Sequence, residues 1–338
     1  MAIQTINSGS LPQFTDLVKR NFAYQLDEMP QVMRTSGFVM DDPMEQNTGE
    51  FKRYAERLHR NQYGSRRDEG DTAQQAKVQY GYEKDLQVHT VSLEVSITKR
   101  MRVAGKNQDI IDAVTNLSTV CPNSVDLDLS HRLTFAFDTS YTDRDGNSID
   151  VTIGDGLALW SAVHTLTGSA TTYNNIVTGN PQFSKGALEN AQKLAVEETF
   201  NNLWEKMMMN FDILFSTDDP NTNNQIKELL KATADVTTNN EGTFNVYANA
   251  LRHIRIPRLA TTASGGVDTA KRKFWGITSS MNSSFYYSSL EEPYLKTPID
   301  GNNWEEFSSE NWNYLSACTY WITIVDWRWL KISKWDWS

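Results

Sequence analysis

The sequence predicts a mixed α+β fold, and two patterns along its 338 residues predict it. Some segments space apolar residues three and four positions apart, as an amphipathic helix does, for example residues 108–118. Others alternate apolar and polar residues, as a strand with one covered face does, for example residues 91–97. With 39% hydrophobic residues, the chain can build one large core or two ordinary ones.

The N-terminal third combines a helical pattern with a long charged excursion. Phe14, Leu17 and Val18 share one face of a helix expected within residues 11–26. Residues 50–71 are dense in charge, and strand-like segments flank a tip rich in glycine and arginine. This pattern predicts an extended hairpin whose tip is too polar to fold back into a core.

Residues 108–118 predict a helix, and proline sets its expected end. Its apolar face consists of Ile110, Ile111, Val114 and Leu117. Pro122 is expected to interrupt this helix because proline lacks the N–H that a continuing helix uses, although residues 124–140 allow it to resume. Residues 143–147 then mark a turn.

The C-terminal part predicts two more helices and a series of strands. One helix is expected over residues 184–207 with Ser184 as its cap, and another over residues 221–233, capped by an asparagine. Residues 210–215 predict a strand between them. Further strands are expected at residues 244–249, 253–259, 273–279, 283–289 and 320–338.

Composition excludes several classes of protein. A formal charge of -10 argues against a protein that binds nucleic acid by neutralising phosphates. Cys121 and Cys318 are the only cysteines and the five histidines are scattered, so neither a zinc site nor another metal or cofactor is predicted. In the turn "TDRDGNSID" the glycine comes too early for a calcium loop.

No targeting or membrane segment is expected. The first residues lack a basic region followed by an apolar core, so no secretory signal is predicted. No apolar run approaches the roughly 20 residues that a membrane span needs. We therefore expect a soluble protein made in the cytoplasm.

The segment "GDGLALWSAVHT", residues 154–165, resembles two kinds of active site but fits neither. Gly154 and Gly156 begin a dinucleotide fingerprint, yet Leu159 stands where its third glycine belongs, so a turn is the better interpretation. Ser161 and His164 suggest a hydrolase, but the strained G-x-S-x-G turn of a nucleophile is missing. A histidine between apolar residues is usually a packed, hydrogen-bonded one.

Basic residues concentrate in the charged excursion. They are Lys52, Arg53, Arg57, Arg60, Arg66 and Arg67. Interleaved tyrosines make contact with nucleic acid conceivable, but neighbouring acidic residues keep the local excess small. A basic-leaning projection on an acidic protein suits the surface of a neighbouring copy, and an ordinary solvated face is the alternative.

Tryptophans gather at the C-terminal end. They are Trp321, Trp327, Trp329, Trp335 and Trp337. Such clusters can bind sugars or lie at a membrane interface. Their alternation along a predicted strand favours sheet packing and contact between subunits.

Several of these segments together resemble the major capsid proteins of tailed phages, including the Mu-like branch. Residues 155–175 are similar to the family's "DG-x-x-LFS-x-x-H … N" segment, with a tryptophan where phenylalanine is more usual. The matching residues are Asp155, Gly156, Leu159, Trp160, Ser161, His164, Asn174 and Asn175. Downstream, "VDWRWLKIS" is similar to the family's closing D-x-R strand through Asp326 and Arg328. The N-terminal third matches by shape only.

The resemblance implies the Hong Kong 97-type capsid fold. Its parts would be an N-terminal arm (1–45), an extended hairpin called the E-loop (46–98), a peripheral domain with a spine helix (99–153, completed by 316–338) and an axial domain (154–315). Gly154, Asp155 and Gly156 would form a structural turn into the axial domain. Contacts with other subunits would come from Lys52, Arg53, Arg57, Arg60, Arg66, Arg67, Lys77 and Lys84.

The resemblance also implies a function without catalysis. Copies would self-assemble into hexamers and pentamers of an icosahedral head that encloses double-stranded phage DNA without sequence-specific binding. No catalytic residue and no cofactor are expected, and the protein would reside in the virion. The partners implied are a separate scaffolding protein, a portal and a possible decoration protein.

Three alternatives remain open. An encapsulin-type compartment shell would share the fold and enclose a cargo enzyme in place of DNA. A hydrolase would use Ser161 and His164. Another virion component, such as a tail or decoration protein, is disfavoured by the axial-domain segments.

Overall fold

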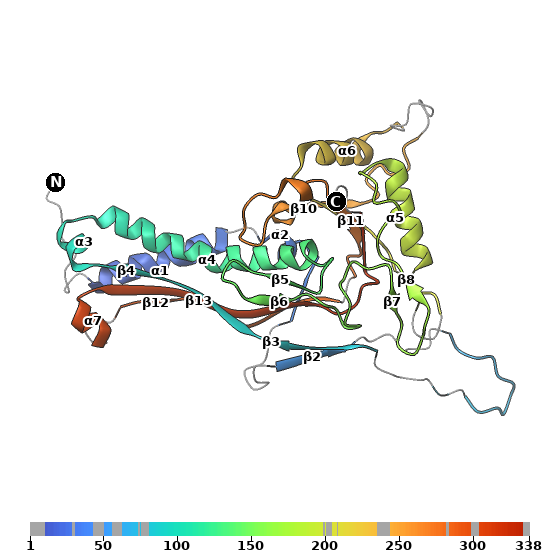
Figure 1. The fold of residues 1–338 in the computed structure, drawn as a ribbon, viewed down its shortest axis with the longest axis horizontal. Coiled ribbons are helices and arrows are strands. Elements are labelled where there is room, and N and C mark those ends of the chain that lie inside the picture. Colours follow the sequence, from blue (N-terminus) through green and yellow to red (C-terminus); the bar gives the residue numbers. More distant parts are fainter. Residues whose placement is uncertain are drawn as a thin grey trace.

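The computed structural model describes most of the chain. The described residues are 11–28, 31–42, 51–55, 63–73, 75, 81–198, 200, 205–207, 209–234, 244–281, 284–298 and 304–333. Figure 1 shows an elongated molecule with a long sheet and its helices at one end, a second sheet at the other, and a ribbon projecting beside them. The mixed α+β class is confirmed.

The long sheet has the strand order β1-β12-β13-β4. Its strands are β1 (Met40–Asp41), β4 (His89–Ile97), β12 (Phe285–Lys296) and β13 (Trp312–Ile324). β12 and β13 pair antiparallel, and the connection between them carries α7 (Trp304–Ser309). β4 lies antiparallel to β13, so the strand predicted at residues 91–97 is confirmed.

Helices cover this sheet. They are α1 (Leu11–Glu28), α2 (Val32–Thr35), α3 (Lys99–Val103) and α4 (Asn107–Thr134). α4 packs on β4 and β13, and α1 packs on α4. The apolar face predicted for α1 is right in part: Phe14 and Val18 are buried, but Leu17 is 45% exposed.

The predicted break at Pro122 is wrong, because α4 is one helix of 28 residues that runs through the proline. Proline removes one backbone hydrogen bond, the one that the carbonyl of Ser118 would accept. Cys121 and Val125 on either side are both fully buried against the sheet. Burial of the same face before and after the proline outweighs the missing bond.

The second sheet has the strand order β10-β9-β11-β14. Its strands are β9 (Ile213–Ser216), β10 (Arg252–Arg255), β11 (Trp275–Thr278) and β14 (Leu330–Ser333). Further elements are the helices α5 (Lys185–Glu197) and α6 (Pro220–Lys231), the 3₁₀ turns η3 (Pro257–Ala260) and η4 (Thr269–Lys271), and the hairpin strands β5 (Ser140–Thr142), β6 (Ser148–Asp150), β7 (His164–Thr165) and β8 (Thr172–Tyr173). The turn expected at residues 143–147 joins β5 to β6.

The structure confirms the predicted cap of α5 and corrects the predicted cap of α6. Ser184 caps α5 as predicted, since its hydroxyl accepts a hydrogen bond from the N–H of Ala187, although the helix ends at Glu197 and not at residue 207. The cap of α6 is Asp219 and not an asparagine. Its carboxylate accepts from the backbone N–H of Thr222 at 2.9 Å, and Pro220 takes the first helical position.

The strand predicted at residues 244–249 is wrong, because residues 246–250 form turns and Phe244 makes only an isolated bridge with Ala234. Asn245 is buried, and its side-chain amide donates to the carbonyls of Leu229 and Ala232. These carbonyls lie at the end of α6, where the helix offers no donor of its own. The asparagine thus closes the helix, and the segment cannot extend as a strand.

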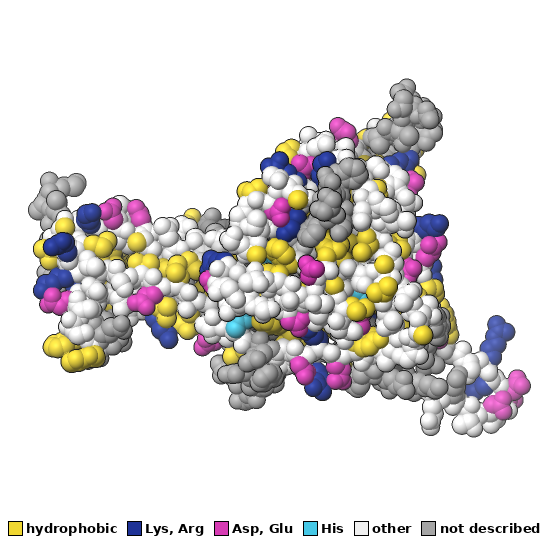
Figure 2. Space-filling view, in the orientation of Figure 1, with side chains coloured by type: hydrophobic (Ala, Val, Ile, Leu, Met, Phe, Trp, Pro, Cys, Tyr) yellow, Lys and Arg dark blue, Asp and Glu magenta, His cyan; other side chains and the backbone are white. Residues whose placement is uncertain are grey.

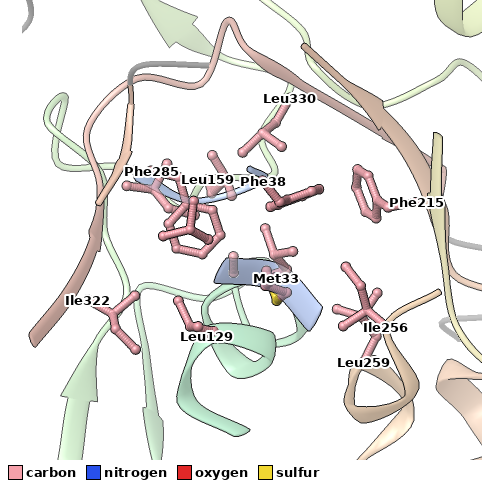
Figure 3. Packing of buried hydrophobic residues seen from close by; sticks show 14 of the residues in the cluster. Met33, Phe38, Leu129, Leu159, Phe215, Ile256, Leu259, Phe285, Ile322 and Leu330 are labelled. Atoms are coloured by element: carbon pink, nitrogen blue, oxygen red, sulfur yellow. The ribbon is translucent and has the colours of Figure 1, made fainter. Parts of the chain in front are cut away.

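The two sheets share one hydrophobic core (Figure 3). The ring of Phe38 contacts Phe215 of β9 at 5.2 Å and Phe285 of β12 at 5.9 Å, both edge to face. Met33 and Leu129 are fully buried beside it. Because one core reaches both sheets, they form a single folded body.

The predicted hairpin is confirmed where the structure describes it. β2 (Phe51–Ala55) pairs antiparallel with β3 (Glu83–Gln87) as a separate two-stranded sheet. We call these strands and the residues that connect them the ribbon, and residues 63–73 the ribbon tip. The division into an arm, an E-loop and two domains stays a prediction.

Candidate functional site

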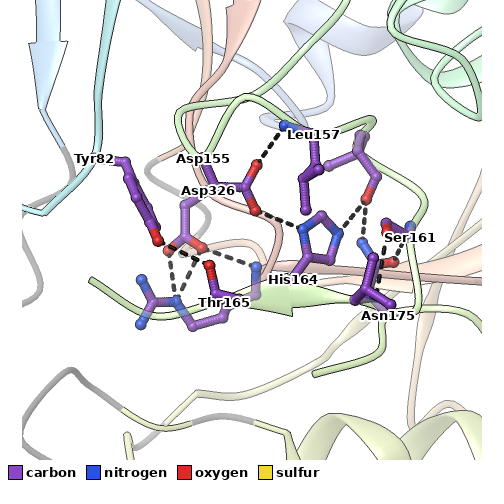
Figure 4. A network of polar contacts seen from close by, with 11 residues as sticks. Tyr82, Asp155, Leu157, Ser161, His164, Thr165, Asn175 and Asp326 are labelled. Atoms are coloured by element: carbon purple, nitrogen blue, oxygen red, sulfur yellow. Dashed lines mark hydrogen bonds and ion pairs between the residues drawn. The ribbon is translucent and has the colours of Figure 1, made fainter. Parts of the chain in front are cut away.

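Residues 154–175 contact residues 325–331 beside the base of the ribbon, and we call this contact the junction (Figure 4). Gly154 lies so close to the neighbouring backbone that an added Cβ would meet the carbonyl oxygen of Val325 at 2.9 Å. Gly156 has a φ of +78°, which glycine adopts without strain. Asp155 accepts the N–H of Leu157 through Oδ1 at 2.9 Å. These residues form a tight turn.

His164 is fully buried in the junction, and both of its ring nitrogens have partners. Nδ1 lies 2.7 Å from the Asp155 carboxylate, and Nε2 lies 2.9 Å from the carbonyl oxygen of Leu159. The ring stacks on Trp327 at 4.8 Å with an angle of 4° between the planes. The carbonyl can only accept, so Nε2 carries the hydrogen and has no lone pair for a substrate.

Ser161 and Asn175 fasten the same loop. The Ser161 hydroxyl accepts the N–H of Val163 at 3.2 Å. The buried Asn175 accepts the N–H of Ser161 at 3.1 Å and donates to the carbonyl of Leu159 at 2.6 Å. The Ser161 hydroxyl is hydrogen-bonded within its own loop, and Nε2 of His164 already donates to a carbonyl. This geometry supports a structural role for both residues and does not support nucleophilic catalysis.

Trp160 connects the junction to α4. Its indole N–H donates to the carbonyl of Leu133 at 2.6 Å, close to the end of that helix. A phenylalanine would fill the space but leave this carbonyl without the bond. The tryptophan therefore adds a polar contact that a phenylalanine at this position could not make.

A buried group of charges lies beneath the turn. Arg328 contacts Asp326 at 3.0 Å, and their side chains are 0% and 5% exposed. Burial raises the pKa of Asp326 and lowers the pKa of Arg328, because each charge loses its water, and their contact offsets that cost. Arg328 also donates to the carbonyl of Phe200 at 2.8 Å.

Lys331 is the least compensated member of this group. Its side chain is fully buried, and among the described residues its Nζ has no hydrogen-bond partner. The Nζ atom lies 4.8 Å from the centre of the Trp327 ring. Burial lowers the pKa of Lys331 to about 7, while the charges of Glu198 and Asp326 act in the opposite direction.

The base of the ribbon is fixed to the body of its own chain. Tyr54 is buried, and its hydroxyl donates to Asp42 at 2.7 Å and lies 2.6 Å from the Ser288 hydroxyl. Leu86 of β3 is buried against Val325. These contacts hold both ribbon strands beside β12 and the junction.

Three of the eight predicted contact cations pair within the chain at this base. Lys52 lies 2.8 Å from Asp42, Arg53 lies 2.6 Å from Asp85, and Lys84 lies 2.5 Å from Asp150. The Asp85 carboxylate raises the pKa of Arg53, and the hydrogen bond from Arg53 lowers the pKa of Asp85. These cations therefore position the ribbon, whatever further contact they make.

Two more of these cations lie on the ribbon tip, whose described residues are all exposed. Arg67 donates to the carbonyl of Asp71 at 3.1 Å, while Arg66 has no hydrogen bond or ion pair to any described residue. Figure 2 shows the tip reaching beyond the body with side chains of both signs. Arg57, Arg60 and Lys77 lie outside the described residues.

The sequence offered no signal for the partners of these groups. Asp42, Asp150 and Glu198 act on cations that are 10, 66 and 133 positions away in the chain, respectively. Only the fold brings them together. Trp327 was noted for its residue type, but its stacking on His164 had no sequence signature.

Two further observations concern ions and membranes. Within the described ranges, no three His, Cys, Asp or Glu side chains are placed to hold a metal ion. None of the helices described is both long and apolar enough to span a bilayer.

Comparison with known proteins finds likeness in structure alone. No family model and no curated protein matches the sequence. A solved chain titled "Gordonia phage Cozz" superposes with a TM-score of 0.53 at 12% identity, covering 91% of this chain and 87% of that one. A chain of "Cyanophage Pam1 capsid asymmetric unit" gives 0.48 at 10% identity, covering 88% and 86%. One of "The capsid of Myoviridae Phage XM1" gives 0.45 at 12%, covering 89% and 90%. The chain thus shares its fold with a phage protein.

Proposed function

We propose that this chain is the major capsid protein of a tailed phage, with the Hong Kong 97-type fold. The observation that carries the proposal is the structural match to the Gordonia phage Cozz chain, which extends over nine-tenths of this chain at a TM-score of 0.53. The motif resemblance at residues 155–175 independently implies the same family. The Mu-like branch is part of this proposal.

The ribbon supports assembly as the mode of action. A two-stranded ribbon is marginally stable by itself in water, and the contacts of this one with the body that involve described residues lie at its base. Its tip is exposed and charged, which suits it to bind the surface of another copy. A projection that meets a different surface on the next copy produces a ring when the rotation closes. We infer hexamers and pentamers formed in this way, which build a shell around DNA.

The junction supports the same function from inside the subunit. Gly154, Asp155 and Gly156 turn the chain between the two sheets, and His164 holds the turn by two hydrogen bonds. The base of the ribbon reaches this turn through Val325, which packs with Tyr54 and Leu86 and whose carbonyl accepts the N–H of Gly154 at 3.1 Å. Scaffolding, portal and decoration proteins, and a place in the virion, follow from the proposal as expected partners and location.

Assembly of the purified chain tests the proposal. We expect light scattering and negative-stain microscopy to show rings or closed particles at high protein concentration. Replacing residues 63–73 with a Gly-Ser linker of equal length should abolish particles and leave the thermal unfolding of the monomer unchanged. A wild-type chain that stays monomeric at every concentration would overturn the proposal. Particles from infected cells that hold a cargo enzyme and no DNA would favour the encapsulin alternative.

A further inference from the structure

Two buried thiols lie together where α4 packs on the long sheet. Cys121 belongs to α4 and Cys318 to β13, and both are free, fully buried members of the core that reaches both sheets. They are 197 positions apart and are the two cysteines of the chain. Only the fold brings them into one place, and it holds them away from solvent.

The two thiols differ in how readily they ionise. A hydrogen bond with the Cys318 thiol lowers the pKa of Cys121 to about 7, and the Ser316 hydroxyl, 3.5 Å from its Sγ, acts in the same direction against the effect of burial. The contact with Cys121 raises the pKa of Cys318, and so do burial and the charges of Glu292 and Asp128. Cys121 is therefore the thiol that becomes a thiolate, which is the form that oxidants attack.

The backbone beside Cys121 has room to adjust. Cys121 is followed by Pro122, where α4 lacks one backbone hydrogen bond. A disulfide holds its two sulfurs about 2 Å apart, closer than two hydrogen-bonded thiols lie, so α4 has to shift slightly toward β13 to form one. Helices bend most easily where their hydrogen-bond ladder is interrupted. The interruption at Pro122 permits this shift and gives a small oxidant a way to the thiols.

We propose that Cys121 and Cys318 form a redox site, in which oxidation joins α4 to β13 by a disulfide bond. With hydrogen peroxide as the oxidant, the Cys121 thiolate attacks one peroxide oxygen, becomes a sulfenic acid and releases hydroxide. The Cys318 thiol then attacks the Cys121 sulfur, the disulfide forms and water leaves. The two electrons and two protons that the thiols lose convert one peroxide into two water molecules.

The bond would restrain the helix that lies along the long sheet (Figure 1). It would fix the middle of α4 to β13 and close a loop of more than half the chain, which stabilises the fold mainly by restricting the unfolded state. Thiols stay reduced in a cytoplasm and oxidise outside it. In a capsid protein the bond would therefore form after particles leave the cell, and this timing alone rests on the proposed function.

Counting thiols in the full-length chain tests the site. Reduced protein is treated with hydrogen peroxide, unfolded in urea and alkylated with N-ethylmaleimide, and mass spectrometry then counts the maleimides. We expect two maleimides on the reduced chain, none after oxidation, and two again after dithiothreitol. Peptide mapping should find the fragments containing Cys121 and Cys318 linked to each other. Unfolding of the oxidised chain should shift to higher urea concentration and return on reduction.

Single variants test the roles of the two thiols. In Cys318→Ser the sulfenic acid of Cys121 has no thiol to react with, so dimedone, a reagent that labels sulfenic acids, should label it. In the matched variant Cys121→Ser, Cys318 should take up no dimedone and keep its maleimide. Neither variant should show the shift in urea unfolding on oxidation.

The contradicting outcomes are distinct from those for the proposed function. Two thiols that stay reactive after peroxide, a loss that dithiothreitol does not reverse, or disulfides only between chains on a non-reducing gel would overturn the site. Equal dimedone labelling of the two variants would overturn the roles. The measurements need no assembly, so their failure leaves the capsid function standing, and a chain that never assembles leaves the redox site standing.

Discussion

The ribbon and the junction both pair opposite charges, but in different surroundings. At the ribbon base the side chains of Arg53 and Asp85 are 61% and 58% exposed. In the junction the side chains of Arg328 and Asp326 are 0% and 5% exposed. Water screens the first pair and cannot reach the second. Replacing Arg53 or Asp85 should therefore change the free energy of unfolding little. Replacing Arg328 or Asp326 should lower it strongly, because the other charge is left buried without its partner.

The largest effect is expected from Arg328→Met. The substitution leaves the Asp326 carboxylate buried without its guanidinium, so the free energy of unfolding should fall by ~3–5 kcal/mol. Urea denaturation followed by fluorescence measures it. The matched control is Arg144→Met, which removes an exposed pair and should cost less than ~0.5 kcal/mol. Equal losses in the two variants would remove the distinction between the regions.

His164→Ala should follow in size. It deletes the stacking on Trp327 and leaves the buried Asp155 carboxylate without its partner, for a loss of ~2–4 kcal/mol. Thermal unfolding measures the loss, and Ser161→Ala, which removes one weak loop contact, should cost under ~1 kcal/mol. Particles that remain intact while a hydrolytic activity disappears would instead support the hydrolase alternative.

The pH dependence of stability sharpens the comparison through Lys331. Its folded pKa of about 7 lies below the unfolded value of 10.5, so between these pH values the unfolded chain binds one more proton. Stability should therefore rise with pH from about 7 toward 9.5, by up to ~1.4 kcal/mol per pH unit. Denaturation curves of the wild type and of Lys331→Met, compared across this range, measure the slope. The same slope in both proteins would show that another group is responsible.

The smallest effect is expected from Lys84→Met at the ribbon base. Lys84 is mostly covered, with 16% of its side chain exposed, but its partner Asp150 is 57% exposed. The loss of unfolding free energy should be ~0–1 kcal/mol. Hydrogen exchange should nevertheless become faster in β3, because the contact joins that strand to β6. If β3 keeps its protection, the buried Tyr54 and Leu86 alone fix the ribbon.

Local signals explain what could be predicted from the sequence. The alternation in β4 and the cap at Ser184 depend on residues a few positions apart, and both were found. The helix through Pro122 was missed because the burial that sustains it is provided by a distant strand. Asn245 was missed as a cap because its acceptors belong to a helix earlier in the chain.

The candidate site was predictable to a similar degree. The turn at Gly154 and Gly156 could be inferred, because glycine spacing reports local geometry. The use of Lys84 within its own chain could not, since Asp150 lies 66 residues further on. Composition marks which residues can pair, and only the fold selects the partners.

The passage of α4 through Pro122 has a mechanical consequence. A helix of 28 residues is about 42 Å long and behaves as a stiff rod along the sheet. One rung of its hydrogen-bond ladder is absent between Ser118 and Pro122, so resistance to bending is lowest there. Load applied to either end would make the rod flex at this point before it flexes elsewhere.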